Sequence, residues 1–323
     1  HIREEGIYSL EKGRTFYTSN AGLKPLKVEI CEYLKRRCDV AYDPDREVLV
    51  SVGGSEAIDL AMRAMINDGD EVLVPQPSYV SYMPCVTLAD GVPVVIQLEE
   101  KDQFRLTPEK LLEKITDKTK ILVLPFPNNP TGAIMEREDL EKIVEIVLEK
   151  DLFVVSDEIY SELTYGDEPH VTIASFPGMK ERTVLINGFS KAYAMTGWRL
   201  GYAAAPAAIL EQMLKIHQYA IMCAPTTSQY AAVSALKNGD PDVAMMRESY
   251  NQRRRFLLHA FAEMGIECFE PKGAFYTFPN IKRFGMTSEE FATRLLQEEK
   301  VAVVPGTAFG GCGEGFVRIS YAY

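Results

Sequence analysis

Short apolar runs that end in small or polar residues alternate with helical patterns along the first two thirds of the chain. The runs are rich in β-branched and aliphatic residues and lack a clean polar alternation, which is typical of strands buried on both faces. The runs cover residues 48–54, 71–79, 121–130, 152–158, 183–191 and 200–206, and the helical patterns cover 55–66, 107–115 and 137–150. This alternation predicts an α/β fold with a doubly wound, mostly parallel sheet.

The pattern changes after about residue 230. Long helical stretches at 228–237 and 241–265 precede short stretches of sheet character at 273–280 and 316–323. We therefore expect two domains, a large one at 1–230 and a smaller C-terminal α+β domain at 231–323.

Charge and composition exclude several classes of protein. Asp and Glu number 46 and Lys and Arg 35, a net charge of −11, which argues against a nucleic-acid-binding surface. The four histidines lack the spacing of metal ligands, and no apolar run is long enough to predict a membrane span. Six scattered cysteines without a C-x-x-C pair favour free thiols in a reducing cytoplasm. We expect a cytoplasmic protein with no metal, nucleic acid or membrane partner.

The residues that follow the apolar runs are the candidates for function, because ligands of an open parallel sheet bind beyond the carboxyl ends of its strands. A glycine turn that opens a helix can hold a phosphate. Each residue alone also has an ordinary explanation as a turn, a cap, a core aromatic or a surface cation. The residues are Gly53-Gly54-Ser55, Tyr79, Asn129, Asp157, Tyr160 and Lys191.

Together these residue types match what pyridoxal 5'-phosphate requires of a protein. A lysine amine can condense with its aldehyde, and a buried aspartate keeps its ring nitrogen protonated. An asparagine amide and a tyrosine hydroxyl can bond its phenolate oxygen, and an aromatic ring can stack on it. Its phosphate suits a helix N-terminus with an arginine such as Arg199. The combination therefore predicts a site for this cofactor.

The chain resembles the class I/II aminotransferases of pyridoxal-phosphate fold type I along essentially its whole length. It looks most similar to the branch that contains prokaryotic aspartate and aromatic aminotransferases. The resemblance implies the transfer of an amino group between an L-amino acid and a 2-oxo acid in ping-pong fashion. The motifs that carry it, in the family's order and spacing, are YTSNAGL, VGGSEA, PQPSY, PNNPTG, SDEIY, SKAYAMTGWRLGY, GAFYTFP and VRISYAY.

The resemblance implies a role for each residue that matches a family motif. Lys191 would be the catalytic residue, which forms the Schiff base and then moves the proton between substrate and cofactor. Tyr17 would reach the phosphate of the neighbouring subunit, which implies a homodimer with shared active sites. The other implied contacts are Asp157 to the ring nitrogen, Tyr160 and Asn129 to the phenolate oxygen, Tyr79 to the ring face, Gly54, Ser55 and Arg199 to the phosphate, and Arg318 with Asn129 to the substrate carboxylate.

Three features depart from the family pattern or stay outside it. Gly188 stands where many relatives carry a phosphate-bonding serine, so we expect that contact to be lost or supplied elsewhere; Ser190 lies next to Lys191. We expect the family's N-terminal arm and final helix to lie outside residues 1–323. We expect Trp198, the only tryptophan, to pack rather than to bind.

Two other functions stay open at this point. A pyridoxal-phosphate-dependent carbon–sulfur β-lyase has the same fold, although such lyases often carry histidine where Tyr160 stands. A non-catalytic ligand-sensing module is opposed by the presence of Lys191, Asp157 and Arg318. A nucleotide-binding dehydrogenase is disfavoured because VGGSEA is not G-x-G-x-x-G.

The amino donor and the 2-oxo acid are not specified by these motifs. Arg318 reads only the carboxylate that all amino acids share. Ser55 stands where some acidic-substrate relatives place a lysine, which argues mildly against a strict aspartate enzyme.

Overall fold

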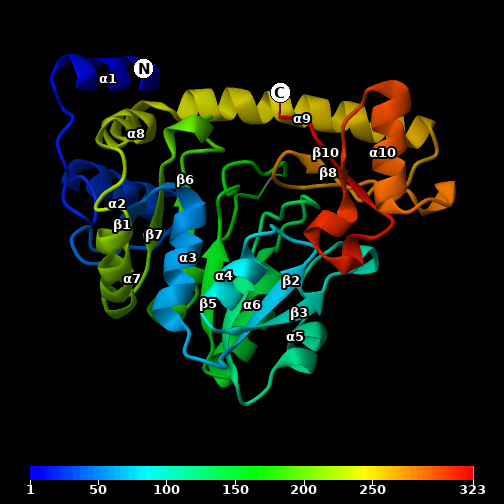
Figure 1. The fold of residues 1–323 in the computed structure, drawn as a ribbon, viewed down its shortest axis with the longest axis horizontal. Helices are drawn as coiled ribbons and strands as arrows, with labels where there is room; N and C mark the ends of the chain where they lie inside the picture. The colour runs from blue at the N-terminus through cyan, green and yellow to red at the C-terminus, as the bar shows by residue number, and fades with distance from the viewer. Residues whose placement is uncertain (167, 323) are drawn as a thin grey trace.

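A seven-stranded sheet forms the centre of the large part of the molecule in this computed structural model, which describes residues 1–166 and 168–322 (Figure 1). The strand order is β1-β7-β6-β5-β4-β2-β3, and β7 is the one described strand that runs against its neighbours in this sheet. The expected α/β fold with a mostly parallel sheet is therefore confirmed. The strands are β1 (Val48–Ser51), β2 (Glu71–Gln76), β3 (Val92–Gln97), β4 (Thr119–Leu124), β5 (Phe153–Asp157), β6 (Thr183–Gly188) and β7 (Gly201–Ala204).

Helices cover both faces of the sheet, which explains why the strands read as continuous apolar runs. Successive residues of one strand enter opposite layers, as Leu122 and Val123 of β4 do. One layer is formed by α3 (Gly53–Met65), α4 (Tyr82–Leu88) and α7 (Ala207–Ala220). The other is formed by α2 (Lys24–Cys38), α5 (Pro108–Lys114), α6 (Arg137–Glu149) and α8 (Thr226–Asn238).

Strand β3 is the element of the sheet that the apolar runs did not predict. It lies at the edge of the sheet, and two of its valines, Val92 and Val95, are exposed. Pro93 also removes one backbone donor, which an edge strand tolerates. A half-exposed edge strand carries a weaker apolar signal than a central one, so it was missed.

The C-terminal part holds a small antiparallel sheet and the longest described helix. Helix α9 (Asp240–Glu263) runs across the molecule, with α1 (Ile2–Glu11) and α8 near one end and α10 (Ser288–Glu299) near the other (Figure 1). The expected boundary between residues 230 and 231 falls inside α8, which packs against α1 and α2, so the division into two domains stays a prediction. The small sheet has the order β8 (Tyr276–Thr277), β10 (Val317–Ser320) and β9 (Val304–Pro305), and the last residue of the VRISYAY motif, Tyr323, lies outside the described residues.

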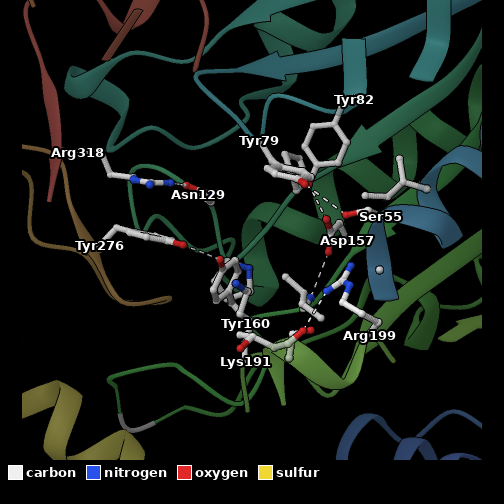
Figure 2. A pocket seen from close by; sticks show the side chains of 17 residues that line it. Ser55, Tyr79, Tyr82, Asn129, Asp157, Tyr160, Lys191, Arg199, Tyr276 and Arg318 are labelled. Atoms are coloured by element: carbon white, nitrogen blue, oxygen red, sulfur yellow. Dashed lines mark hydrogen bonds between the residues drawn. The ribbon is translucent and has the colours of Figure 1, made fainter. Parts of the chain in front are cut away.

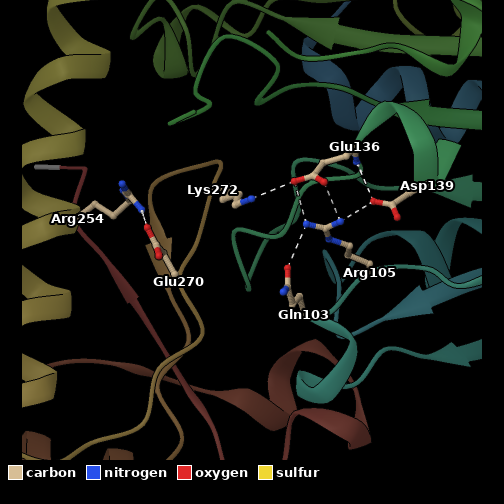
Figure 3. Close-up of polar contacts among 7 residues, drawn as sticks. All are labelled: Gln103, Arg105, Glu136, Asp139, Arg254, Glu270 and Lys272. Atoms are coloured by element: carbon tan, nitrogen blue, oxygen red, sulfur yellow. Dashed lines mark hydrogen bonds and ion pairs between the residues drawn. The ribbon is translucent and has the colours of Figure 1, made fainter. Parts of the chain in front are cut away.

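A tight contact joins the C-terminal part to the PNNPTG turn. The backbone N–H of Lys272 donates to the Gly132 carbonyl at 3.0 Å, and Lys272 Nζ donates to Glu136 Oε1 at 3.0 Å (Figure 3). Gly132 has a φ of +73°, and a Cβ there would lie 2.3 Å from Cβ of Pro271. Only glycine fits this conformation and this approach. The contact places the GAFYTFP segment beside the carboxyl edge of the large sheet.

Candidate active site

A cavity of about 350 Å³ opens at the carboxyl edge of the large sheet. Strands β1, β2, β4, β5 and β6 all end there, and β7 begins there because it runs in the opposite direction. The reversed strand is the reason that Arg199, which precedes β7, reaches the same edge as Lys191, which follows β6. Nine of the ten predicted site residues line this cavity: Gly54, Ser55, Tyr79, Asn129, Asp157, Tyr160, Lys191, Arg199 and Arg318.

Asp157 is the last residue of β5 and is buried at the base of the cavity. Its Oδ2 accepts a hydrogen bond of 2.7 Å from the Tyr82 hydroxyl, and its Oδ1 accepts one of 3.2 Å from the Ile159 N–H (Figure 2). Burial raises the pKa of this carboxyl above its ordinary value, against the lowering effect of those hydrogen bonds. A buried carboxylate without an ion-pair partner among the described residues fits a cationic ring nitrogen.

Lys191 follows β6 by three residues and extends into the cavity from a half-buried position. Its Nζ lies 5.8 Å from the centre of the Tyr160 ring and 5.6 Å from that of Phe275. Burial lowers the pKa of the amine, and the positive charge of Arg318 lowers it further. Both effects favour the neutral amine, which is the form that attacks a carbonyl carbon.

A glycine cradle lies where the phosphate was predicted. Helix α3 begins at Gly53, which has a φ of +80°, and a Cβ on Gly53 would lie 2.7 Å from Arg199 Nη2. A Cβ on Gly201 would lie 2.6 Å from the backbone nitrogen of Gly54. Glycine at positions 53 and 201 therefore lets Arg199 and β7 pack closely against the N-terminus of α3. A guanidinium beside a helix N-terminus suits a phosphate.

The space around Gly188 explains its departure from the family pattern. Gly188 is paired with Gly201 across β6 and β7, and a Cβ on Gly188 would lie 2.9 Å from Cα of Gly201. The backbone therefore leaves no room for a serine at this position. Ser55, Ser190 and Thr196 line the cavity instead and offer hydroxyl groups.

Arg318, on β10, lies in the cavity between two aromatic rings. Its guanidinium carbon is 4.4 Å from the centre of the Tyr276 ring and 4.8 Å from that of Phe309. Its Nη1 donates to Asn129 Oδ1 at 2.8 Å (Figure 2). Its Nε is buried and has no hydrogen-bond partner within the described part of the chain. A buried, unpaired donor on a fixed guanidinium fits a carboxylate.

The neighbouring asparagine has a structural function instead. Asn128 is buried, and its Oδ1 accepts hydrogen bonds from the N–H and the hydroxyl of Thr131 at 3.1 and 2.7 Å. It shapes the turn that presents Asn129.

Two tyrosines of the cavity were not predicted from the sequence. Tyr82 donates to Asp157, and the Tyr276 hydroxyl lies 2.9 Å from the Tyr160 hydroxyl (Figure 2). Tyr82 lies three residues after Tyr79 at the start of α4, so a helical spacing could have indicated it. Tyr276 lies inside the GAFYTFP motif, whose position beside the cavity depends on the tertiary contact at Gly132.

Trp198 packs as expected, and its partner is the first helix. A Cβ on Gly6 of α1 would lie 2.6 Å from Cη2 of the indole, and the Trp198 carbonyl accepts a 2.7 Å hydrogen bond from Ser228 of α8. The residue before Arg199 therefore connects the cavity to α1 and α8.

Tyr17 lies apart from the other nine predicted residues. It is 76% exposed and does not line the cavity. Its neighbour Phe16 is also exposed, and its carbonyl accepts a 2.7 Å hydrogen bond from Thr226 at the start of α8.

The described residues contain neither a candidate metal site nor a candidate membrane span. No group of His, Cys, Asp and Glu in residues 1–166 and 168–322 could hold a metal ion. The described helices include none with the length and apolar character that crossing a membrane requires.

Comparison with known proteins gives one consistent result. The sequence model of "Aminotransferase class I and II" matches residues 1–323. The Bacillus subtilis protein YugH is 52% identical over 100% of this chain and 83% of its own length. The aspartate aminotransferase of Pyrococcus abyssi is 47% identical with the same two coverages. The crystal structure of an aromatic aminotransferase from Pyrococcus horikoshii OT3 has a TM-score of 0.98 at 47% identity and covers 100% of this chain and 87% of its own.

Proposed function

The chain belongs to the class I and II aminotransferases, a family of pyridoxal-phosphate enzymes, and we propose that its nine cavity residues hold this cofactor in the roles that the sequence predicts. The observation that carries the proposal is the convergence of Lys191, Asp157 and Arg318 on one cavity. An amine, a buried carboxylate and a guanidinium with an unpaired buried donor match the aldehyde, the ring nitrogen and the substrate carboxylate, respectively.

The bound cofactor supplies an electron sink that stabilises negative charge at the substrate Cα. The chain contributes the groups around it. Asp157 keeps the ring nitrogen protonated, and the Tyr82 hydroxyl holds the carboxylate in place. Asn129 and Tyr160 donate to the phenolate oxygen, and Tyr79 covers the ring.

Lys191 holds the cofactor and then moves the proton. Its free amine would move the proton between the substrate Cα and the cofactor carbon that lies on the other side of the substrate nitrogen. Burial and Arg318 lower the pKa of this amine, which favours its neutral form over that of an exposed lysine. Arg318 grips the substrate carboxylate as a fork and so fixes which bond at Cα faces the lysine.

We propose that the enzyme prefers an amino donor without a second carboxylate. The cations that line the cavity are Lys191, Arg199 and Arg318, and each already has a proposed partner. Aromatic rings of Tyr79 and Tyr276 line the remaining space. Rates with a panel of amino donors and 2-oxoglutarate as acceptor test this preference, and a faster reaction with aspartate than with phenylalanine contradicts it.

A second copy of this chain completes the site. The exposed surface patch, which consists of Phe16, Tyr17, Tyr219, Ile221 and Met222, is apolar and aromatic. A hydrogen bond joins the two chain segments that form the patch: Asn20 Nδ2 donates to Gln218 Oε1 at 3.2 Å. A homodimer would cover this patch and bring Tyr17 of one subunit to the phosphate of the other.

The cysteines support a cytoplasmic location. All six are free thiols in the structure, as a reducing compartment would keep them.

Absorption spectroscopy of the purified protein tests the cofactor site. The wild-type protein incubated with pyridoxal phosphate should show the visible band of the lysine–cofactor linkage and should consume an amino donor with 2-oxoglutarate. Lys191→Ala should lose both, whereas Lys215→Ala, on the exposed side of α7, should retain both. A wild-type protein that never acquires the band contradicts the proposal.

Product analysis separates the rival reactions. A β-lyase releases pyruvate from cystathionine without a 2-oxo acid, whereas an aminotransferase requires the acceptor. A ligand-sensing module would bind the cofactor and show neither reaction. Tyr160, in place of the histidine common in such lyases, supports the aminotransferase.

A further inference from the structure

We propose that Tyr276 is a positioning residue that couples the carboxylate-binding Arg318 to Tyr160, the donor to the cofactor's phenolate oxygen. The proposal rests on the proposed function, because both partners take their roles from it. Tyr276 itself has no role in the sequence prediction.

Two contacts of one side chain carry the inference. The Tyr276 hydroxyl oxygen lies 2.9 Å from that of Tyr160, and the face of the same ring lies 4.4 Å from the guanidinium carbon of Arg318 (Figure 2). Tyr276 is buried, and its contact with Tyr160 is shielded from water. A cation over an aromatic face is attracted to it, more strongly when both are desolvated. One rigid ring therefore sets the positions of two functional groups.

The backbone holds this ring from two sides. Tyr276 pairs with Ser320 across β8 and β10, two residues from Arg318. Ala274, which has a φ of +58°, donates its N–H to the Leu163 carbonyl at 2.9 Å, close to Tyr160 in the chain. The Tyr276 ring is therefore connected through the backbone both to the strand that carries Arg318 and to the segment that carries Tyr160. A displacement of Arg318 on substrate binding would be passed to the Tyr160 hydroxyl.

The number of protons on the two hydroxyls fixes the direction of their hydrogen bond. A tyrosine hydroxyl carries one proton and can donate it to only one acceptor at a time. If Tyr160 donates to the phenolate oxygen, the bond between the tyrosines must be donated by Tyr276. This second bond orients the Tyr160 proton toward the cofactor and polarises it, which strengthens the donation.

The other charged and titratable groups near the pair stay in place when the Tyr276 hydroxyl is removed. Arg318 faces both tyrosines from β10, Tyr79 faces Tyr276 from the segment after β2, and Asp157 and Lys191 face Tyr160 from β5 and the segment after β6. A change seen in Tyr276→Phe therefore reports the hydroxyl.

A pH titration of the bound cofactor's absorption tests the hydroxyl contact. Hydrogen bonds to the phenolate oxygen favour the form in which the lysine–cofactor linkage has lost its proton, since the negative charge is then unbalanced. Tyr276→Phe weakens this donation, so the midpoint of the spectral transition should rise by ~0.3 to 1 pH unit. Tyr250→Phe removes a hydroxyl from a ring that packs on Phe275 and should leave the midpoint unchanged.

A double-mutant cycle shows whether Tyr276 acts through Tyr160. Tyr160→Phe should raise the midpoint by more than Tyr276→Phe does, and adding Tyr276→Phe to Tyr160→Phe should change it no further. An equal shift in both backgrounds overturns the coupling, because Tyr276 would then act on the cofactor independently.

A second variant tests the contact with Arg318. Tyr276→Leu removes the ring as well as the hydroxyl, so KM for the amino donor that the wild-type enzyme uses should rise several-fold above the KM of Tyr276→Phe. Equal KM values in the two variants overturn this half of the proposal.

Different results would contradict the proposed function and the proposed role of Tyr276. A wild-type protein without the cofactor band contradicts the proposed function. A wild-type protein with the band, together with a Tyr276→Phe midpoint equal to that of the wild type, overturns the role of Tyr276 alone.

Discussion

The buried carboxylate of Asp157 destabilises the cofactor-free fold, although the proposed function requires it. Burial raises the pKa of its carboxyl above the ordinary 3.8, so the folded chain without cofactor binds this proton more tightly than the unfolded chain does. Its contribution to the free energy of unfolding therefore falls as the pH rises from the unfolded value through the folded one. Above the folded value the cofactor-free protein carries the full penalty, which a cationic ring nitrogen would relieve.

Replacing this carboxyl should separate stability from activity. Cofactor-free Asp157→Asn should be more stable than the cofactor-free wild type at pH 7, by ~0.5 to 2 kcal/mol, and the difference should shrink toward pH 4. With cofactor, its kcat/KM should fall by roughly 10²- to 10³-fold, because the ring nitrogen loses its counter-charge. Urea unfolding and steady-state rates measure the two effects.

Asp151→Asn is the control, since this carboxylate is exposed and pairs with Arg182. This substitution should change neither kcat/KM nor the pH dependence of the free energy of unfolding. A cofactor-free Asp157→Asn that is less stable than the wild type at pH 7 contradicts the argument.

Gly188 gives a second prediction at this scale. Gly188→Ser restores the hydroxyl that many relatives carry, but its Cβ would lie 2.9 Å from Cα of Gly201. We expect a loss of ~1 to 3 kcal/mol of stability and no gain in cofactor affinity, measured by unfolding and by equilibrium titration. Gly197→Ser, where a Cβ would meet nothing within 4 Å, should be near neutral. Tighter cofactor binding by Gly188→Ser would contradict this prediction, because the backbone near Gly201 would then have moved to make room for the side chain.

Helix α1 depends on one close contact that no pattern in its own sequence reveals. Gly6 and Ser9 are its buried residues, and Gly6 lies against the Trp198 ring beside Arg199. The helix has hydrophobic residues that stay exposed, such as Ile7 and Leu10. Its docking therefore rests on the fit of a glycine to an indole and on its packing against α8.

Enlarging Gly6 should release α1 from Trp198. In Gly6→Leu the new side chain would occupy the place of the indole, at a cost of ~1 to 3 kcal/mol. Because Trp198 is the only tryptophan, its fluorescence should shift to longer wavelength as water reaches the ring. Ile7→Leu, at a residue that is 50% exposed, should leave emission and stability unchanged. An unshifted emission maximum in Gly6→Leu would mean that α1 does not rest on this contact.

On the scale of the whole molecule, the surface patch around Tyr17 predicts the oligomeric state. An isolated chain would leave Tyr219, at 87% exposure, and Ile221 open to water. A second copy that covers them removes apolar surface from water, which is the main driving force of association.

A charge in the patch should weaken the dimer. The wild-type protein should sediment as a dimer, and Ile221→Asp should shift the equilibrium toward monomer and lower cofactor affinity, because Tyr17 of the partner leaves the phosphate. Phe256→Asp, at an exposed residue of α9, should remain dimeric. A monomeric wild type with full activity contradicts both the dimer and the role of Tyr17.

Much of this organisation could be predicted from the sequence because it is local. The buried strands are continuous apolar segments, and helix starts carry local signals such as Thr107, which accepts a hydrogen bond from the Lys110 N–H at 3.5 Å. The residues after each strand could be brought to one edge by the rule for parallel sheets alone. For this reason seven of the nine predicted residues in the cavity end or follow strands of the large sheet, whereas Arg199 precedes β7 and Arg318 lies on β10.

Other features depend on contacts between distant segments. Strand β3 was missed because one exposed side weakens its apolar signal, and the direction of β7 is set by its neighbours β1 and β6. The roles of Tyr82 and Tyr276 depend on their hydroxyls, which lie against Asp157 and Tyr160. The sequence around a tyrosine does not indicate which side chain its hydroxyl will contact in the folded protein.

The sequence by itself determined the fold class, the family and the residue types of the site, since these follow from local apolar patterns and motif order. Tertiary structure alone decided why Gly188 cannot be serine, what Trp198 packs against and how Tyr276 joins two functional groups. The physical reason is that each of these depends on a distance between atoms far apart in the chain: Gly188 to Gly201, Trp198 to Gly6, and Tyr276 to both Tyr160 and Arg318. Such distances are set by the packing of the whole chain.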